Sequence, residues 1–421
     1  MTDKQMANKQ MTDVAIVGGG MAGASLALLL AYHCPELKVT LLERQAIAVD
    51  VGELKLPSFD TRATAIAAGS LRIFDELGLW SELQKFAAPI GRVQVSDRGH
   101  SLGASLQAQR EADASFAGML GAVIENAALG PMLYRALAGS RVDVWAPAEV
   151  AKVEMHPQGA HLEVQCETQL IYLDARLLVV ADGADSALCR QLGIATEKVD
   201  YQQHALVTTV GLQRDHNGVA YERFTDRGPM ALLPLPKRDG MHRAALVWTC
   251  ENGSEQELAG LPETEFLQRL QDSFGWRAGR IVRAGKVHSY PLTLSLAREQ
   301  VRRGVALVGN SAHFLHPVAG QGFNLTLRDC DSLARIIGRE MAAKGANFAQ
   351  SGPGELELMQ HFWRERQQDQ MLTIGFSDKV PSLFASRNLL VSGLRQLGLL
   401  GLALAPTARA AFARQAAGIA R

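Results

Sequence analysis

The sequence predicts an α/β protein with a Rossmann-like domain, a second domain built on an antiparallel sheet, and a C-terminal helical segment. Three features support this prediction. A strand, a glycine-rich turn, a helix and another strand follow one another between residues 13 and 43. Two further glycine-containing stretches follow predicted strands near residues 182 and 309. Apolar and polar residues alternate through 87–105 and 201–290, as in a sheet with one solvated face.

The composition limits what kind of protein this can be. A chain of 421 residues is too long for one ordinary core, and 47% hydrophobic with 20% charged residues is typical of a globular protein of about two domains. The formal net charge is zero, so the overall charge does not favour nucleic acid as a partner. The five cysteines lack CxxC or zinc-type spacing, which indicates neither disulfides nor a metal and favours the reducing cytoplasm.

The N-terminal region predicts neither a secretion signal nor a membrane span. Residues 1–11 are polar and lack the apolar core and cleavage site of a signal peptide. The apolar run 14–31 is interrupted by four glycines, so we interpret it as a strand, a turn and a buried helix.

The glycine turn in this run has the spacing of a dinucleotide-binding unit. A strand at 13–17 leads into Gly-Gly-Gly-Met-Ala-Gly at 18–23, and a helix at 24–32 and a strand at 39–43 follow. The complete strand–turn–helix–strand order makes this motif much more specific than GxGxxG alone. A glycine-rich turn in an apolar hairpin is the alternative, and it leaves the acid at the end of the second strand unexplained.

Each glycine of the motif, and the acid that follows it, has a physical role in this unit. Gly18 permits the tight turn, Gly20 lets the backbone approach a pyrophosphate, and Gly23 allows the helix to pack closely on the strand. Glu43 can accept hydrogen bonds from a ribose diol and disfavours a 2′-phosphate. The unit alone does not distinguish FAD from NAD.

The two later stretches have their own signals. After antiparallel segments at 150–164 and 169–173, the strand 176–180 runs into Asp-Gly-Ala-Asp-Ser-Ala-Leu-Cys-Arg at 182–190. The stretch 309–324 places glycines, a proline and an asparagine at the start of a helix, where unpaired N–H groups and the helix dipole favour an anionic or electron-rich partner.

In order and spacing, the three stretches together resemble the FAD-dependent aromatic hydroxylases of the para-hydroxybenzoate hydroxylase type, over roughly residues 12 to 375. The resemblance implies FAD as cofactor. It places Asp182 and Arg190 near the FAD pyrophosphate, although an N-capped surface turn is the alternative. It also implies that Arg62 contacts FAD phosphates and Asn126 the ribityl chain; a salt-bridged arginine and a simple N-cap are the alternatives.

The same resemblance assigns most of the third stretch to the flavin ring, with a glycine-rich helix entry made for packing as the alternative. The family usually has Gly-Asp where this chain has Gly309-Asn310, and a neutral amide still hydrogen-bonds a ribose hydroxyl without charge assistance. The residues implied to run along the flavin are Pro317, Gly320, Gly322, Phe323 and Asn324.

Several segments narrow the resemblance to the hydroxylases of ubiquinone biosynthesis, and within them to the 2-polyprenyl-6-methoxyphenol hydroxylases. These segments are 62–80, 123–137, 316–325 and 376–388. The resemblance implies a monooxygenase that hydroxylates a polyprenyl-methoxyphenol ring through a flavin C4a-hydroperoxide, with O2 and transiently bound NAD(P)H. Hydroxylation of another ring position in the pathway, or flavin-dependent reduction of a prenylated substrate, is the alternative. Other ubiquinone-biosynthesis proteins are expected as partners.

The catalytic candidates lie in the flavin-facing stretch. A basic group that withdraws the phenol proton would make the ring a better nucleophile, and His313 and His316 are the candidates for it. Pro317 follows them and is expected to border the reacting ring. Each histidine has an equally simple alternative as a structural donor to backbone.

The motifs and patterns divide the chain into interleaved segments. The FAD-binding domain is predicted at 12–86, 106–200 and 291–375, the substrate domain at 87–105 and 201–290, and basic amphipathic helices at 376–421.

The last of these segments predicts contact with a surface. Residues 379–421 hold six basic and no acidic residues, with leucines at helical spacing. The segment is too short and glycine-broken to span a bilayer, but it suits the anionic inner face of the plasma membrane or a protein partner. A helical cap packed on the core is the alternative.

Overall fold

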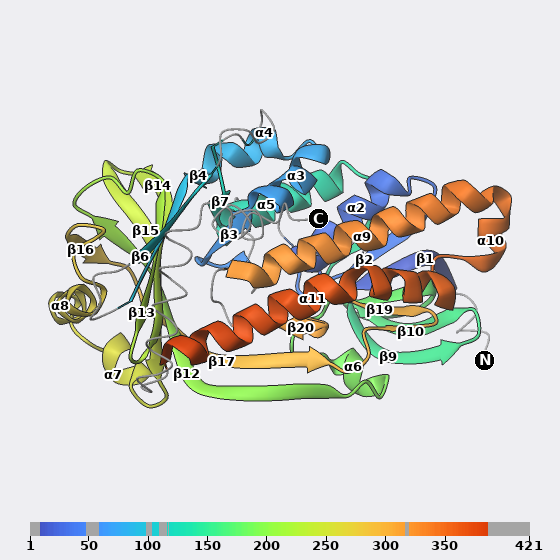
Figure 1. Cartoon of the computed structure of the whole chain (residues 1–421). Helices are drawn as coiled ribbons and strands as arrows, with labels where there is room; N and C mark the ends of the chain where they lie inside the picture. Colours follow the sequence, from blue (N-terminus) through green and yellow to red (C-terminus); the bar gives the residue numbers. More distant parts are fainter. Residues whose placement is uncertain are drawn as a thin grey trace.

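The computed structural model describes residues 9–47, 59–97, 103–108, 116, 118–315 and 320–385. Within these residues the chain forms three sheets with helices packed between and around them (Figure 1). The predicted α/β class, with a Rossmann-like part and a largely antiparallel second sheet, is confirmed.

The first sheet carries the nucleotide-binding type of topology. Its strand order is β18-β19-β11-β1-β2-β8, and five of these strands run parallel. The register sets Val17 beside both Leu42 and Val180, and Val180 beside Leu307, so the strands end at one common edge. The parallel strands are β1 (Lys9–Val17), β2 (Val39–Leu42), β8 (Asp143–Trp145), β11 (Gln169–Val180) and β19 (Val305–Leu307).

Antiparallel strands extend this sheet on the other side of β11. The hairpin β9 (Glu149–His156) and β10 (Gly159–Cys166) pairs with the first half of β11, and β18 (Val301–Arg302) pairs with β19. The second half of β11 is thereby left to pair with β19 and to end at the common edge.

One core lies between the parallel strands and three helices, α2 (Met21–His33), α5 (Asn126–Ala138) and α9 (Gln321–Lys344). The residues of α2 from Gly23 to Leu30 are all buried, because the sheet covers one side of this helix and α5 and α9 cover others. This enclosure explains why the apolar run in the sequence resembled a membrane segment. Among the described helices, none combines the length and the apolar character that crossing a bilayer requires.

A small sheet of three strands lies beside this core, with the order β3 (Ala63–Ala67), β7 (Gly121–Glu125) and β4 (Ala87–Ile90). The sequence predicted that residue 87 begins the substrate domain. The structure instead pairs 87–90 with β7, from Ala87 beside Ile124 to Ile90 beside Gly121. The sheet partner of such a short segment depends on distant residues, which the local alternation does not contain.

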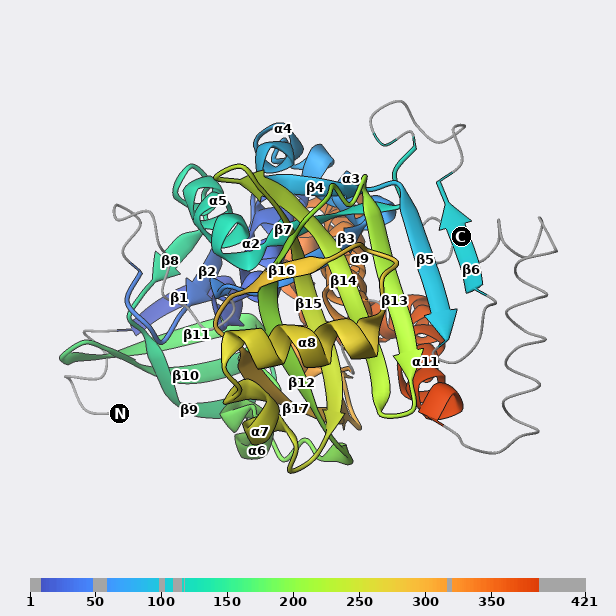
Figure 2. The same ribbon diagram turned by 90° about the vertical axis from the view of Figure 1, so that its left-hand side faces the viewer.

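The third sheet has nine strands in the order β20-β17-β12-β15-β14-β13-β5-β6, with β16 beside β12 (Figure 2). All its pairs are antiparallel except β13 with β5. Its strands are β5 (Arg92–Asp97), β6 (Gly103–Gln107), β12 (Thr196–Leu212), β13 (Val219–Thr225), β14 (Gly228–Arg238), β15 (Met241–Glu251), β16 (Ile281–Ala284), β17 (His288–Ala297) and β20 (His313–Phe314).

Two long strands of this sheet cross the predicted domain boundaries. Strand β12 continues through residue 201 and β17 through residue 290, so the division between the two domains falls inside paired strands. Helix α8 (Glu263–Phe274) packs across one face of the sheet through Phe266, Leu270 and Phe274 (Figure 2). The other face is left to border the interior of the molecule.

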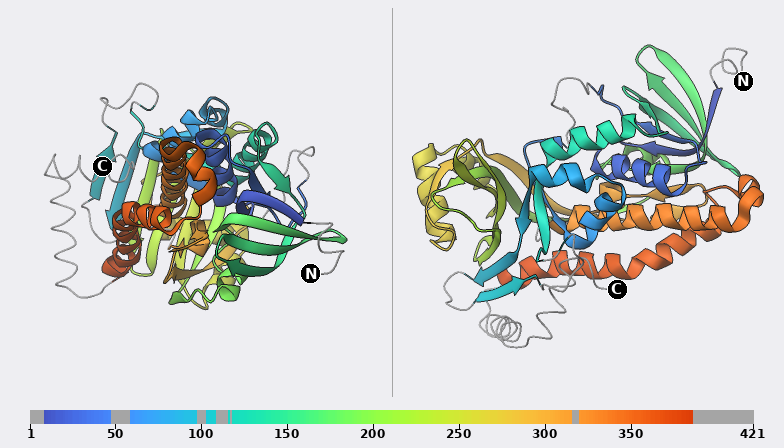
Figure 3. Two further views of the ribbon diagram at one scale, coloured as in Figure 1. Left: turned by 90° about the vertical axis from the view of Figure 1, so that its right-hand side faces the viewer. Right: turned by 90° about the horizontal axis from the view of Figure 1, so that it is seen from above.

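Helix α11 (Leu356–Ala385) runs alongside α9 and reaches the third sheet (Figures 1 and 3). It is continuous across residue 376, where the sequence predicted that a C-terminal segment begins. The basic part of that segment from residue 386 onward lies outside the described residues.

A buried carboxylate joins α9, α11 and β20. Asp329 is 2% exposed; its Oδ1 accepts from Arg366 Nε at 2.6 Å, and its Oδ2 accepts from His313 Nε2 at 2.8 Å and Gln370 Nε2 at 3.0 Å. Burial alone would raise the pKa of Asp329, but the hydrogen bond from His313 and the charge of Arg366 outweigh it and hold the pKa below its ordinary value. The charged form is therefore part of the folded state.

We predict that Asp329→Asn lowers the free energy of unfolding by about 3 kcal/mol at neutral pH, because the variant removes the buried carboxylate that pairs with Arg366 and leaves that guanidinium with Asp369 alone. Since the folded-state pKa lies below the unfolded one, the stabilisation by Asp329 is complete above about pH 4 and declines below it. Urea unfolding at several pH values measures this difference.

The control is Glu340→Gln on the same helix, whose pair with Lys344 is at the surface and should change stability by less than about 1 kcal/mol. A loss for Asp329→Asn that equals the control, or that grows as the pH falls toward 3, would contradict the role of the buried charge.

Candidate active site

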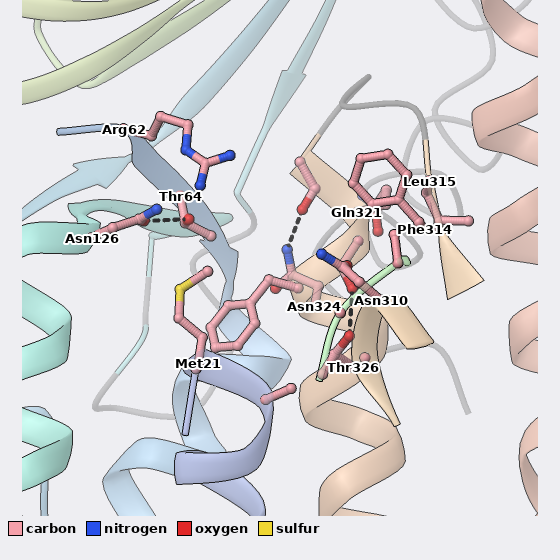
Figure 4. A pocket seen from close by; sticks show the side chains of 18 of the residues that line it. Met21, Arg62, Thr64, Asn126, Asn310, Phe314, Leu315, Gln321, Asn324 and Thr326 are labelled. Carbon is pink, nitrogen blue, oxygen red and sulfur yellow. Dashed lines mark hydrogen bonds between the residues drawn. The ribbon is translucent and has the colours of Figure 1, made fainter. Parts of the chain in front are cut away.

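A cavity of about 1810 Å³ extends from the glycine turn to the open face of the nine-stranded sheet. Its lining includes residues of all three stretches that the sequence singled out. Figure 4 shows side chains from separate elements, among them Met21, Arg62, Asn126 and Asn324, around this one space.

At one end of the cavity, hydrogen bonds fix the shape of the glycine turn. Glu43 Oε2 accepts from the Gly19 N–H and Oε1 from the Gln45 N–H, both at 2.8 Å, and the Tyr134 hydroxyl donates to Gly19 O at 2.7 Å. Gly18 has φ +108°, and a Cβ there would lie 2.4 Å from Ala181 O. No local sequence pattern predicts the role of Tyr134, which reaches the turn from α5.

The start of α2 is open toward the same space. Gly20 caps the helix without a side-chain hydrogen bond and lines the cavity, so the first N–H groups of α2 are available to an anionic ligand. A Cβ on Gly23 would lie only 1.9 Å from Gly18 O, so the helix and turn pack too closely for any other residue.

The Asp-Gly stretch follows β11 at the common strand edge. Asp182 lines the cavity and its Oδ2 accepts from Ser186 Oγ at 2.9 Å, while Ser186 in turn caps α6 (Ala187–Gln191) through the Cys189 N–H. Surrounding protein atoms displace water from the Asp182 carboxylate and raise its pKa, while the hydrogen bond from Ser186 acts in the opposite direction and lowers it less. Arg190 lines the cavity too, and its Nη1 donates to Asp185 O at 3.0 Å.

Arg62 and Asn126 both line the cavity and lie on the same side of it in Figure 4. Arg62 is ion-paired with Asp60, at 2.7 Å from Nε to Oδ2, and its guanidinium lies 4.9 Å from the centre of the Tyr290 ring. Asn126 accepts a hydrogen bond from Thr64 Oγ1 at 2.7 Å. The ion pair of Arg62 with Asp60 is local, because the two residues are two positions apart. The contact of Arg62 with Tyr290 joins residues far apart in the sequence, so no local pattern predicts it.

The third stretch reaches the cavity from the start of α9. Gly309, Asn310, Gly320, Gly322, Phe323 and Asn324 all line it. The amide of Asn324 is engaged with backbone, because Oδ1 accepts from Ala67 N and Nδ2 donates to Ala65 O and Gly320 O, each at 2.8 Å. Asn324 therefore holds the start of α9 against β3, and its side chain positions the stretch.

The two predicted histidines have different outcomes. His313 is 1% exposed, does not line the cavity, and points its Nε2 at Asp329, so its placement supports a structural role and does not support its prediction as a base. His316 and Pro317 lie outside the described residues.

The opposite wall of the cavity is the open face of the nine-stranded sheet. Its side chains there are mostly small and apolar, including Val95, Ala205, Val207, Ala220, Ala231, Leu233 and Val247. On α11, Leu372, Thr373 and Phe376 close one side. The cavity thus has a polar end with two helix N-termini and an apolar end.

The residues at the polar end fit a flavin dinucleotide. Two helices, α2 and α9, begin at the cavity without side-chain caps, and Glu43 stands where a ribose diol would be bound. A Cβ on Gly322 would meet no described atom within 4 Å, so this helical glycine leaves space inside the cavity that a side chain would fill.

Comparison with known proteins agrees with this geometry. A family model described as the FAD binding domain matches residues 11–347. The chain therefore belongs to this family of FAD-binding proteins, and the predicted cofactor FAD is confirmed.

Its relatives narrow the class further. The chain is 34% identical to ubiquinone hydroxylase UbiL of Rhodospirillum rubrum, over 93% of this chain and 86% of the relative. It is 29% identical to 3-demethoxyubiquinol 3-hydroxylase of Escherichia coli, over 93% and 96%. These relatives confirm the resemblance to the FAD-dependent hydroxylases of ubiquinone biosynthesis.

The solved structures agree in fold. p-Nitrophenol 4-monooxygenase PnpA from Pseudomonas putida DLL-E4 superimposes with a TM-score of 0.72 at 16% identity, covering 96% of this chain and 97% of that one. PqsL of Pseudomonas aeruginosa gives 0.72 at 19% identity, covering 93% and 100%.

We predict that Gly322→Ala changes stability and cofactor binding in opposite directions. Alanine in the first turn of α9 should raise the unfolding free energy of the FAD-free protein by about 0.5–1 kcal/mol, because glycine is a poor helix former. The added methyl group should weaken FAD binding by about tenfold, since it occupies cavity space. Flavin titration and urea unfolding measure the two effects.

The matched control is Gly375→Ala, a helical glycine of α11 with open space around it that does not line the cavity. It should stabilise the protein without changing FAD affinity. Equal FAD affinities for the two variants would show that Gly322 does not face the cofactor.

Proposed function

We propose that this protein is an FAD-dependent monooxygenase that hydroxylates the ring of a polyprenylated methoxyphenol in ubiquinone biosynthesis. The observation that carries the proposal is the continuity of the cavity, which joins the dinucleotide motifs to the apolar face of the third sheet. An aromatic ring could then lie between the cofactor and the sheet while an apolar tail remains in the same space.

The composition of the wall supports a prenylated substrate. Each Å² of this apolar lining that a ligand removes from water favours binding by about 25 cal/mol. An isoprenoid tail is entirely apolar, so it can bury such a surface without losing hydrogen bonds to water. The small residues Ala220, Ala231 and Val247 leave width for such a tail. The relatives described above carry names of ubiquinone hydroxylases, which supports the same pathway.

Different residues of this chain would bind different parts of FAD. The N–H groups at the starts of α2 and α9 would bind its anionic parts and Glu43 would bind its ribose. Arg62 would contact its phosphates and Asn126 its ribityl chain. When bound, FAD supplies the transfer of electrons from NAD(P)H and the activation of O2. The sheet wall and α11 would exclude water from the reacting ring.

A second candidate is hydroxylation at another ring position of the same family of phenols. The name of the relative from Escherichia coli, 3-demethoxyubiquinol 3-hydroxylase, is the observation that favours it. The two candidates share substrate class and chemistry, and differ only in which ring carbon faces the cofactor.

We also propose that the protein contacts the membrane surface from the cytoplasmic side. At that surface it would meet other proteins of the pathway. Helix α11 exposes Trp363 (42%), Met371 (65%) and Leu372 (57%), and Leu372 also borders the cavity. Helix α11 therefore forms the side of the cavity at Leu372, and the basic segment 386–421 follows this helix in the sequence. A substrate with a tail in the bilayer could reach the cavity from there.

The function is tested by incubating the purified protein with FAD, NADPH and a short-chain prenylated methoxyphenol under ¹⁸O₂. We expect a product that carries one ¹⁸O atom as a new ring hydroxyl, detected by mass spectrometry, with its position fixed by NMR. Consumption of NADPH with peroxide as the only product, or a product with a reduced prenyl chain, would contradict a hydroxylase. In cells that lack the protein, the phenol that accumulates identifies the ring position.

Membrane contact is tested by sedimentation with vesicles of phosphatidylglycerol or phosphatidylcholine. We expect binding to the anionic vesicles only, weakened by salt, and reduced about fivefold for each of Arg387, Arg395, Arg409 and Arg414 changed to Gln. Arg227→Gln with Arg238→Gln, both exposed on the third sheet, is the control. Equal binding to the two lipids, or none, would argue against a basic membrane anchor.

A further inference from the structure

An ion pair joins the nine-stranded sheet to the three-stranded sheet beside the cavity. Arg243 lies on β15, and Glu125 is the last residue of β7. Arg243 Nη1 donates to Glu125 Oε1 at 3.1 Å, and Nη2 donates to Oε2 at 3.0 Å. Arg243 Nε donates to Pro236 O at 3.1 Å, so all three nitrogens of the guanidinium are engaged. A bidentate pair of this kind fixes both the separation and the orientation of the groups that it joins.

On the side of Arg243, the pair is connected to the substrate wall of the cavity. Ala244 and Leu246 of β15 pack in the core beneath α8. Side chains alternate across a strand, so Arg243 and Val247 face the opposite side, where Val247 lines the cavity. Ala245, which lies between them, is buried in the core shared with the first sheet. A shift of Arg243 therefore moves a strand that forms part of the apolar wall.

On the side of Glu125, the pair is connected to the polar end of the cavity. Glu125 is paired with Ala63 of β3, and the N–H of the next residue, Asn126, donates to Arg62 O at 2.8 Å. Arg62, Ala63 and Asn126 all line the cavity. The position of Glu125 therefore affects the start of α5 and the cavity-lining part of β3.

The pair is largely protected from water. The side chain of Arg243 is 14% exposed and that of Glu125 is 26% exposed. Neither side chain forms a second ion pair with a residue that the structure describes. Salt and water screen such a pair less than a surface pair, and the loss of one partner leaves the other charge without compensation. The pair is therefore suited to hold the two sheets at a fixed distance.

We infer that Arg243 and Glu125 are positioning residues that set the distance between the substrate wall and bound FAD. The inference rests on the proposed function, because it concerns how the substrate ring is held against the cofactor in that reaction. Neither residue lines the cavity, so each acts through its neighbours on the strand or at the start of the helix.

This distance decides where the electrons of NAD(P)H go. In hydroxylation, one atom of O2 becomes the new ring hydroxyl, and the other accepts two electrons from NAD(P)H and two protons and leaves as water. When the ring is held too far from the cofactor, the same two electrons and two protons convert O2 into hydrogen peroxide, and the phenol is unchanged. A displacement of about 1 Å is sufficient to slow a reaction between bound groups severely.

The test compares wild type with Arg243→Gln, Arg243→Lys, Glu125→Gln and the double variant of Arg243→Gln with Glu125→Gln. The control is Arg302→Gln, because Arg302 also forms two contacts with one carboxylate, that of Glu299, and donates to a backbone carbonyl, but lies on β18 away from the cavity. A short-chain prenylated methoxyphenol is the substrate. Hydroxylated product, hydrogen peroxide and NADPH consumed are measured, together with FAD affinity and the melting temperature.

We expect Arg243→Gln and Glu125→Gln each to lower the yield of hydroxylated product per NADPH by about fivefold, with more peroxide and unchanged FAD affinity. Arg243→Lys, which keeps the charge but not the two parallel hydrogen bonds, should lose about half as much. The double variant should resemble the single variants, since all of them break the same pair. The control should keep the wild-type yield.

A merely structural pair would give a different result. Loss of stability lowers the melting temperature and the amount of active enzyme, but it leaves the yield per NADPH unchanged. A wild-type yield for FAD-loaded Arg243→Gln, or losses that multiply in the double variant, would overturn the inference. If Arg243→Gln does not fold, a wild-type yield for Arg243→Lys overturns it in the same way. Absence of any hydroxylation by wild type would contradict the proposed function itself, and the inference would fall with it.

Discussion

The parallel register of the first sheet is the constraint on which the rest of the site depends. Because Val17, Leu42 and Val180 lie side by side and Leu307 lies beside Val180, the chain leaves the sheet at one edge each time. The glycine turn, Glu43, the Asp-Gly stretch and the Gly309 stretch therefore meet, although nearly 300 residues separate the first from the last. In open parallel sheets ligands bind at such an edge, and here the edge forms the polar end of the cavity.

Two buried polar side chains of α9 connect the core of the first sheet to the other two sheets. Asn324 holds the start of α9 against β3, and Asp329, one helical turn and a half further along α9, holds α11 and β20. Since β20 belongs to the nine-stranded sheet, both ends of the cavity are fixed relative to α9. A water-excluding site between cofactor and substrate requires this kind of rigidity, because an opening between the two sheets would admit solvent.

The sequence was sufficient where the signal is local. The turn at Gly18 to Gly23 follows from backbone sterics, and the acid at Glu43 from the length of one strand–helix–strand unit. It was insufficient where a role depends on a distant partner. His313 can act as a base in chemical terms, but its ring is hydrogen-bonded to Asp329, sixteen residues later, and does not face the cavity. The pairing of 87–90 with β7, and the contact of Tyr134 with Gly19, are equally non-local.

The most direct test of the account is a crystal structure of the protein with FAD bound. The account predicts one FAD whose adenosine ribose lies at Glu43, whose pyrophosphate lies at the start of α2, and whose flavin ring lies beside Gly320 to Asn324, facing the apolar wall of the third sheet. An FAD that contacted only the glycine turn, with its flavin ring outside the cavity and away from the start of α9, would contradict it.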